Sequence, residues 1–308
     1  MSRLRESLRD YLAMRRSLGF KLHTDGTGLH AFVAFMEEAR ADYISTDLAL
    51  TWAKQPTSVQ PGRWAARLTY VRGFARYCQA IDPRTEVPPV GLLPFARQRP
   101  SPYFLSDDDV DRLLQGALEL PAKDGILNHT LHCLFGLLSV SGLRTREALN
   151  LTLDDIDLDD GILRIQSTKF GKSRLVPLHA TTVEALVDYR KRRGQFLAGR
   201  QVPHWFINAR AACLSRDCAY RAFRRLSAEF CPQPGRSRPR MHDLRHRFAL
   251  KTILQWYRSG QDVERNLPIL SAFLGHVEVK NTYWYLSACP ELLEAAKARL
   301  EHYWEQPR

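Results

Sequence analysis

Two arginines, two histidines and a tyrosine in the second half of this chain are side chains that can break a phosphodiester bond without a metal. Arg144 and Arg245 carry permanent charge on planar forks that match two phosphate oxygens. His242 and His276 can hydrogen-bond a phosphate or carry a proton, and the phenol oxygen of Tyr285 can hold a phosphoryl group covalently. Because attack on phosphorus adds negative charge to the non-bridging oxygens, we expect the two arginines to hold those oxygens.

The stretch from His242 to His246 places its polar groups on one face of a helix. Arg245 lies three residues after His242 and His246 lies four, so both can share a face with it. His242 and Asp243 also fit the ligand pair of a metal-dependent phosphohydrolase. That interpretation needs further His and Asp ligands, and the sequence offers no convincing ones, so no metal is expected.

Arg144 follows a Ser-Gly pair that should open a helix, which places its side chain beside the positive end of the helix dipole. Glu147 lies one turn further on, where a carboxylate can pair with an arginine and orient it. A solvated acid on the helix surface is the alternative interpretation of Glu147.

Two tyrosines compete for the role of nucleophile. Tyr283 and Tyr285 are two residues apart, so on a helix they point about 200° apart and only one can face a phosphate. Tyr285 stands nine residues after His276, and this interval favours it. Tyr283 is then a packing or supporting residue.

These residues, taken in order, resemble the motifs of the tyrosine recombinase (phage integrase) family. The resemblance runs from about Phe104 to Tyr285. Its matching pieces are Gly142–Glu147, Thr168–Leu178, His242–His246, and Leu274–His276 followed by Tyr285. Each piece alone is common by chance, whereas all of them in the family's order are highly specific.

The resemblance implies a role for each matching side chain. It makes Lys169 the general acid that protonates the departing 5′ oxygen, with Lys172 in the same turn as its competitor. It selects His242 and Arg245 as catalytic and leaves His246 as a support. Attack by Tyr285 would give a 3′-phosphotyrosyl intermediate that a second hydroxyl can reseal without ATP, so no cofactor is expected.

The pattern of the chain indicates two domains. The pattern is helical from Arg3 to about Ala80, and five prolines from Pro83 to Pro100 indicate extended chain after it, so we expect a helical first domain over residues 1–95 and a linker over residues 96–104. Ser106 followed by three aspartates then predicts a helix start, so a second domain over residues 105–308 follows. The resemblance makes the first a core-binding (SAM-like) DNA-binding domain and the second the catalytic domain, the two holding DNA from opposite sides.

The predicted fold is mainly α with a small antiparallel sheet. Residues 161–166 and 173–178 read as two strands, with Lys169–Lys172 as the turn, and His204–Asn208 as a short additional strand. Helices are predicted over 126–140, 181–196, 215–230, 242–258, 268–274, 281–286 and 290–304. The last of them carries an apolar stripe that covers its own domain or, as the resemblance implies, docks on a neighbouring protomer.

The charge of the chain fits a polyanionic partner. A net charge of +12 and a pI near 9.6 favour binding to DNA, although a merely basic protein is an open alternative. The candidate contacts are Arg63, Arg67, Arg72, Arg76, Lys172 and Arg174. The six cysteines form no CxxC pairs, and no stretch approaches ~18 apolar residues, so we expect a reduced cytoplasmic protein that does not enter a membrane.

The sequence therefore predicts a site-specific recombinase or integrase that cuts and rejoins double-stranded DNA sites as a homotetramer. Integration, excision and transposition are all open, and Arg15–Phe20 resembles recombinases of mobile elements. Participation of other recombinases or accessory factors is open too. The alternatives are a topoisomerase of type IB that relaxes DNA, and a non-catalytic DNA-binding protein on the same scaffold.

Overall fold

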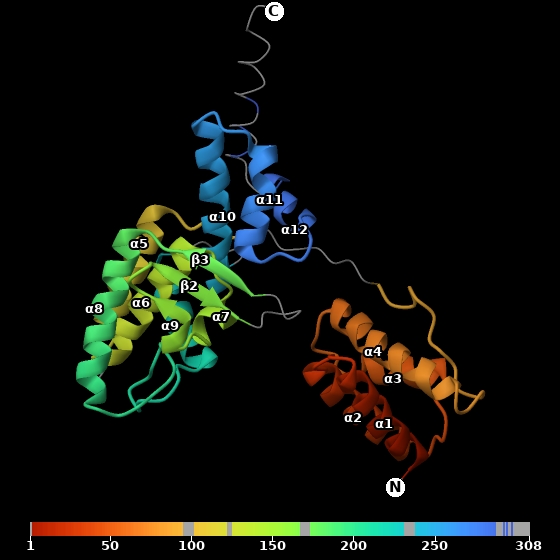
Figure 1. The fold of residues 1–308 in the computed structure, drawn as a ribbon. Helices are drawn as coiled ribbons and strands as arrows, with labels where there is room; N and C mark the ends of the chain where they lie inside the picture. Colours follow the sequence, from red (N-terminus) through yellow and green to blue (C-terminus); the bar gives the residue numbers. More distant parts are fainter. Residues whose placement is uncertain are drawn as a thin grey trace, which may run out of the picture. The chain divides into compact units, whose positions relative to one another are not determined.

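The computed structural model describes residues 2–94, 102–121, 125–166, 173–230 and 238–287, together with residues 292, 294 and 297. The chain divides into two compact units, Met1–Arg99 and Pro100–Arg308 (Figure 1). This division falls within the stretch 96–104. Lys169, Lys172 and nearly all of the helix predicted over 290–304 lie outside the described residues.

All the regular secondary structure in the described residues of the first unit is helical. Its helices are α1 (Arg3–Ser17), α2 (His23–Glu38), α3 (Thr46–Lys54) and α4 (Pro61–Gln79). The hydroxyls of Ser2 and Ser45 cap α1 and α3 by accepting from backbone N–H groups in the first turn. Phe32 and Trp52 meet edge to face at 5.1 Å in a core that all four helices share.

The second unit surrounds a small sheet with helices. The helices are α5 (Asp107–Glu119), α6 (Ile126–Ser141), α7 (Thr145–Leu149), α8 (Ala180–Leu197), α9 (Arg216–Phe230), α10 (Met241–Arg258), α11 (Val263–Leu274) and α12 (Lys280–Tyr283), with 3-10 turns η1 (Leu153–Asp155) and η2 (Trp284–Ser287). Ser106 and Asp109 form a capping box at the start of α5, at the residues where the sequence predicts a helix start. In the described residues no helix is both long and apolar enough to span a membrane.

The sheet has three antiparallel strands in the order β1 (Ile156–Asp157), β2 (Ile162–Ile165) and β3 (Arg174–Pro177). The predicted hairpin is confirmed, with Ile165 opposite Arg174. The prediction of a strand over His204–Asn208 was wrong. That segment bends after His204, so it forms only two isolated bridges, Thr152 with His204 and Ile207 with Cys213.

Helices α10, α11 and α12 lie together, and α10 and α11 share a core with Tyr285 of η2 (Figure 1). Asp262 caps α11 by accepting from the backbone N–H of Arg265, so the helix begins at Val263. It therefore starts five residues before the predicted start at Pro268, and the proline is accommodated inside it. Its far end, Leu274, is where the candidate site forms.

Candidate active site

The last three backbone carbonyls at the end of α11 each accept a hydrogen bond from a different arginine. The bonds run from Arg174 Nε to Phe273 O at 2.8 Å, from Arg245 Nη2 to Leu274 O at 2.7 Å, and from Arg144 Nη2 to Gly275 O at 2.6 Å. The carbonyls at a helix end carry partial negative charge and lack partners within the helix, so cations are stable there. This end of α11 thus gathers side chains from α7, β3 and α10.

Arg144 is fixed by its position at the start of α7. It is the N-cap residue, and its backbone N–H donates to Glu147 Oε2 at 3.0 Å while its Nη1 donates to Oε1 at 2.6 Å. One third of the Arg144 side chain is exposed (33%), so the guanidinium can still meet a ligand. The turn before it depends on Gly142, whose φ is +60° and where a Cβ would lie 2.5 Å from Phe248.

Glu147 joins Arg144 to the hairpin. Arg174, the first residue of β3, donates from Nη2 to Glu147 Oε2 at 2.7 Å and from Nη1 to Oε1 at 3.2 Å. Burial alone would raise the pKa of Glu147, but hydrogen bonds from Arg174 and Arg144 lower it to about 2. The carboxylate is therefore charged at any working pH. The sequence suggested a DNA contact for Arg174, and the structure places its side chain inward, 11% exposed.

The first turns of α10 supply the second arginine. Arg245 is buried, 2% exposed, and donates to Gly142 O at 2.8 Å as well as to Leu274 O. Burial, and next the charge of Arg144, lower the pKa of Arg245 to about 10, so it remains a cation at neutral pH. Asp243 is fully buried and caps α10 by accepting from Arg240, which gives it a structural use in place of metal binding.

His242 lies one turn before His246 on α10. The two rings meet edge to face, with centroids 4.6 Å apart. Burial, followed by the neighbouring His246 and Arg245, lowers the pKa of His242 to about 3, so this ring is neutral at neutral pH. A neutral imidazole can donate its single N–H to a phosphate oxygen. It lacks the second ring proton that an imidazolium would release as a general acid.

Tyr285 lies in η2 and is buried, 2% exposed, whereas Tyr283 is 46% exposed. The two side chains thus take different surroundings, as their spacing predicts. The Tyr285 hydroxyl lies 3.0 Å from His246 Nδ1. The ring of His276 stacks on the Tyr285 ring at 6.4 Å between centroids, and its Nδ1 lies 2.7 Å from Thr282 Oγ1. Tyr285 is close enough to Arg245 for a phenolate charge to raise the pKa of that arginine.

Gly275 allows the Arg174 side chain to approach the backbone at the end of α11 closely. Its φ is +67°, in the left-handed region that ends helices and favours glycine. A Cβ at this position would lie 2.8 Å from Arg174 Nη1. The Gly-His pair of the sequence therefore ends α11 and lets the Arg174 guanidinium pass directly over the backbone.

The arginines of α4 belong to the other unit and have different partners. Arg67 donates to Trp52 O at 2.8 Å and lies 3.7 Å above the Trp52 ring, and Arg72 donates to the carbonyls of Pro88 and Pro89. Arg63 and Arg76 are exposed.

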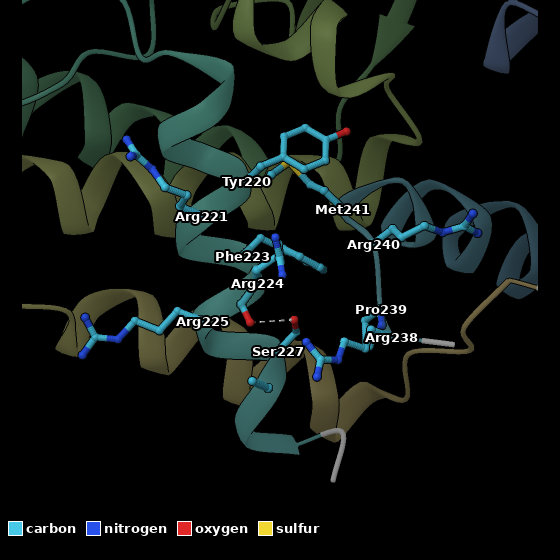
Figure 2. Close-up of a pocket in the computed structure, with 11 residues that line it drawn as sticks. Tyr220, Arg221, Phe223, Arg224, Arg225, Ser227, Arg238, Pro239, Arg240 and Met241 are labelled. Atoms are coloured by element: carbon cyan, nitrogen blue, oxygen red, sulfur yellow. Dashed lines mark hydrogen bonds between the residues drawn. The ribbon is translucent and has the colours of Figure 1, made fainter. Parts of the chain in front are cut away.

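A basic hollow of about 660 Å³ lies beside the start of α10. Figure 2 shows Phe223, Arg224 and Ser227 between α9 and the segment 238–241, while the side chains of Arg221, Arg225 and Arg240 extend outward from the hollow. Its charged lining is Arg221, Arg224, Arg225, Arg238 and Arg240. Arg240 is already paired with Asp243, and the sequence analysis did not single out this surface.

Three features of the site were not predicted from the sequence. They are the row of carbonyls at the end of α11, the pairing of Arg174 with Glu147, and the bond between His276 and Thr282. Only the Gly275-His276 pair signalled a helix end in advance. No cluster of three His, Cys, Asp or Glu side chains suited to a metal occurs among the described residues.

The sequence model of the phage integrase family matches residues 103–291. A putative integrase/recombinase of Sinorhizobium fredii (y4rB) is 49% identical over 311 residues, which cover 99% of each chain. Tyrosine recombinase XerD of Pseudomonas putida is 30% identical over 260 residues, or 81% of this chain and 77% of XerD.

Among solved structures, the fold matches the integrase of transposon Tn1549 in complex with transposon right end DNA. The TM-score is 0.66 at 15% identity, over 96% of this chain and 98% of that one. This likeness extends the match in fold to nearly the whole chain.

Proposed function

The chain belongs to the phage integrase family and is a tyrosine-type site-specific recombinase acting on DNA; from that premise we propose that Tyr285 cuts DNA and holds it as a 3′-phosphotyrosyl intermediate. The observation that carries the proposal is the position of the buried Tyr285 hydroxyl. It lies 3.0 Å from His246 Nδ1 and is near enough to Arg245 for the two charges to interact, while Arg245 and Arg144 are both held at the end of α11. In-line attack on a phosphodiester needs a nucleophilic oxygen near cations that are already in place, and these contacts support that arrangement.

Each site residue has one role in this proposal. Arg144 and Arg245 neutralise the charge that develops on the non-bridging oxygens, and their bonds to α11 hold them in place before DNA arrives. His242, neutral by burial, and His276 hydrogen-bond the same phosphate. Lys169 protonates the departing 5′ oxygen. Glu147 fixes Arg144, and Arg174 fixes Glu147.

The products of this step favour strand exchange. The ester on Tyr285 retains the energy of the phosphodiester bond, so a 5′ hydroxyl from a partner strand can displace the tyrosine without ATP. Exchange between two duplexes requires four cuts. Since each chain supplies one Tyr285, we propose that four copies assemble on two sites.

The biological role that we propose is integration, excision or transposition of a mobile element. The likeness to the Tn1549 integrase, whose complex contains transposon right end DNA, supports this role. The first unit would serve as a DNA-binding domain, contacting the backbone through the exposed Arg63 and Arg76 of α4. The basic rim around the hollow in Figure 2 would add phosphate contacts from the second unit.

Covalent capture of DNA tests the proposal directly. The chain is expressed in cells, the cells are lysed under denaturing conditions, and DNA that stays attached to the protein is sequenced. We expect recovery of a defined site from the wild type, and none from Tyr285→Phe, which should still bind that DNA. Tyr283→Phe is the matched control and should retain the adduct. Adducts that persist in Tyr285→Phe would reject the role of Tyr285.

The same preparations separate the alternatives. Relaxation of arbitrary plasmids by single copies, with no recombinant products, would indicate topoisomerase activity. DNA binding without any adduct from the wild type would indicate a non-catalytic binding protein. Recombinant products between two captured sites are the outcome that the proposal predicts.

A further inference from the structure

His246 follows Arg245 directly and points at the hydroxyl of the proposed nucleophile. Its Nδ1 lies 3.0 Å from Tyr285 Oη, and the two rings meet at 64° with centroids 5.5 Å apart. The Trp284 ring also lies 5.4 Å from the His246 ring. Since Tyr285 is 2% exposed, its proton has little direct access to bulk water and needs an acceptor inside the site.

The other two histidines of the site are placed differently with respect to this oxygen. His276 lies parallel to the Tyr285 ring and directs its Nδ1 to Thr282, so it flanks the ring. His242 presents its ring to His246 at 4.6 Å. His246 therefore contacts both His242 and Tyr285, and its Nδ1 lies within hydrogen-bond distance of the Tyr285 hydroxyl.

We propose that His246 is a catalytic residue, the proton acceptor for the Tyr285 hydroxyl. This inference rests on the proposed function and assigns a task that the sequence left as mere support. The tautomer that it requires carries hydrogen on Nε2 and leaves Nδ1 free to accept from Oη.

In the cutting direction, Oη of Tyr285 forms a bond to phosphorus and its proton passes to His246 Nδ1. The bond between phosphorus and the 5′ oxygen breaks, its electron pair stays on that oxygen, and Lys169 protonates it. Rejoining reverses each transfer, so the imidazolium of His246 returns its proton to Tyr285 when the tyrosine leaves.

A base is needed because a phenol is mostly protonated at neutral pH and attacks poorly in that form. The new positive charge on His246 would lie next to Arg245 in sequence and beside the His242 ring, an unfavourable place for an isolated cation. The phosphate reaches its highest negative charge at the same moment, which offsets that cost. The transfer is therefore favoured only when DNA is bound.

Removal of the imidazole is the main experiment. A duplex carrying the captured site, nicked so that cut strands cannot rejoin, is cleaved in a single turnover by wild type and by His246→Ala. We expect DNA binding to change less than twofold and cleavage to slow by about 10²–10⁴-fold, the usual contribution of a general base. Added imidazole should supply the missing base and recover at least about a tenth of the lost cleavage rate.

A matched control uses a histidine of the same unit outside the site. His132 on α6 is half-buried and its Nδ1 donates to Leu114 O at 3.0 Å, so it is also held by a hydrogen bond, but to a backbone carbonyl and not to Tyr285. His132→Ala should cleave at the rate of the wild type, and imidazole should not change that rate. His246→Gln keeps a hydrogen-bonding group but cannot take a proton, and should be as slow as His246→Ala.

Two results would overturn the assignment. One is cleavage by His246→Ala within threefold of the wild type; the other is a wild-type rate in His246→Gln, which would show a positioning role only. If His246→Ala does not fold, difluorotyrosine at position 285 replaces that test, because its more acidic phenol needs a base less. The loss caused by His246→Gln should then shrink, and an unchanged loss rejects the idea. Absence of adducts from the wild type would reject the proposed function itself.

Discussion

The arginines of α4 and those around the end of α11 make the same kind of hydrogen bond, but the bonds have different structural consequences. In both places guanidiniums donate to backbone carbonyls, as Arg67 does to Trp52 and Arg245 does to Leu274. In α4 each bond ties a different pair of segments within its own unit. At the site, three bonds from three elements meet on three consecutive carbonyls of one helix end.

A row of arginines in a sequence therefore does not by itself identify a phosphate site. Four arginines along α4 look like a DNA-binding stripe, yet Arg67 and Arg72 are held by their own unit. Arg144 and Arg245 are 101 residues apart in the chain, and only the fold brings them together. The informative property is that arginines from separate elements converge on one polar feature, the carbonyls at the end of α11.

The largest effect is expected from Arg245. Arg245→Ala removes one of the two cations and leaves the carbonyls of Gly142 and Leu274 without this partner. We expect single-turnover cleavage to fall by about 10²–10³-fold, the usual loss for one charge-stabilising donor. Arg67→Ala is the comparison in α4 and should leave the cleavage rate of saturated complexes unchanged. Equal losses of cleavage rate in the two variants would show that the arginines of α4 and those at the end of α11 do not differ in this way.

Glu147→Gln tests the link between Arg144 and Arg174. The pKa of Glu147 is about 2 in the folded chain against an ordinary value of 4.5. The charged form therefore stabilises the fold above pH 4.5, and this stabilisation is lost as the pH falls toward 2. The difference corresponds to roughly 3 kcal/mol. Denaturant unfolding should show a gap between wild type and variant at pH 6.5 that narrows at pH 3.5; a constant gap contradicts the ion pair.

Gly275→Ala tests the close approach of Arg174 to the backbone. A Cβ there adds a 2.8 Å contact with Arg174 to the strain of a φ of +67°. The matched control is Gly260→Ala, which has a φ of +69° and nothing within 4 Å of the new atom. Each should lose about 1–3 kcal/mol of unfolding free energy from backbone strain. Only Gly275→Ala should also slow cleavage, and equal cleavage by both variants would speak against a role for this contact.

The smallest effects are expected in α4. Arg76→Ala, at an exposed position, should weaken DNA binding and reduce the slope of log affinity against log salt by about 1, with unchanged stability. Arg67→Ala should instead lower thermal stability, because it removes the bond to Trp52 O and the stacking on its ring. If Arg67→Ala weakened DNA binding and Arg76→Ala lowered thermal stability, Arg67 would be the residue that contacts DNA.

Local patterns predicted the elements of this fold well. The hairpin and the helices α8, α9 and α10 follow from periodicity and capping, and the opposite directions of Tyr283 and Tyr285 follow from their spacing. Each of these depends on residues close together in the chain.

Contacts between distant segments could not be predicted in this way. The inward turn of Arg174 depends on Glu147 and on the end of α11, which are 27 and 99 residues away in the chain. Likewise the hydrogen bond from Tyr285 to His246 spans 39 residues. No periodicity contains such pairings, although the family motifs had already singled out most of the participating residues.

The proposed mechanism depends most on which protein atom forms the covalent bond to DNA. Adducts formed with the captured site can be digested with nuclease and trypsin, and the peptide that starts at Asn281 contains both Tyr283 and Tyr285. Fragment mass spectra then locate the nucleotide. We predict a nucleotide joined through its 3′ phosphate to Tyr285, and a nucleotide on Tyr283, on any other residue or through a 5′ phosphate would contradict the account.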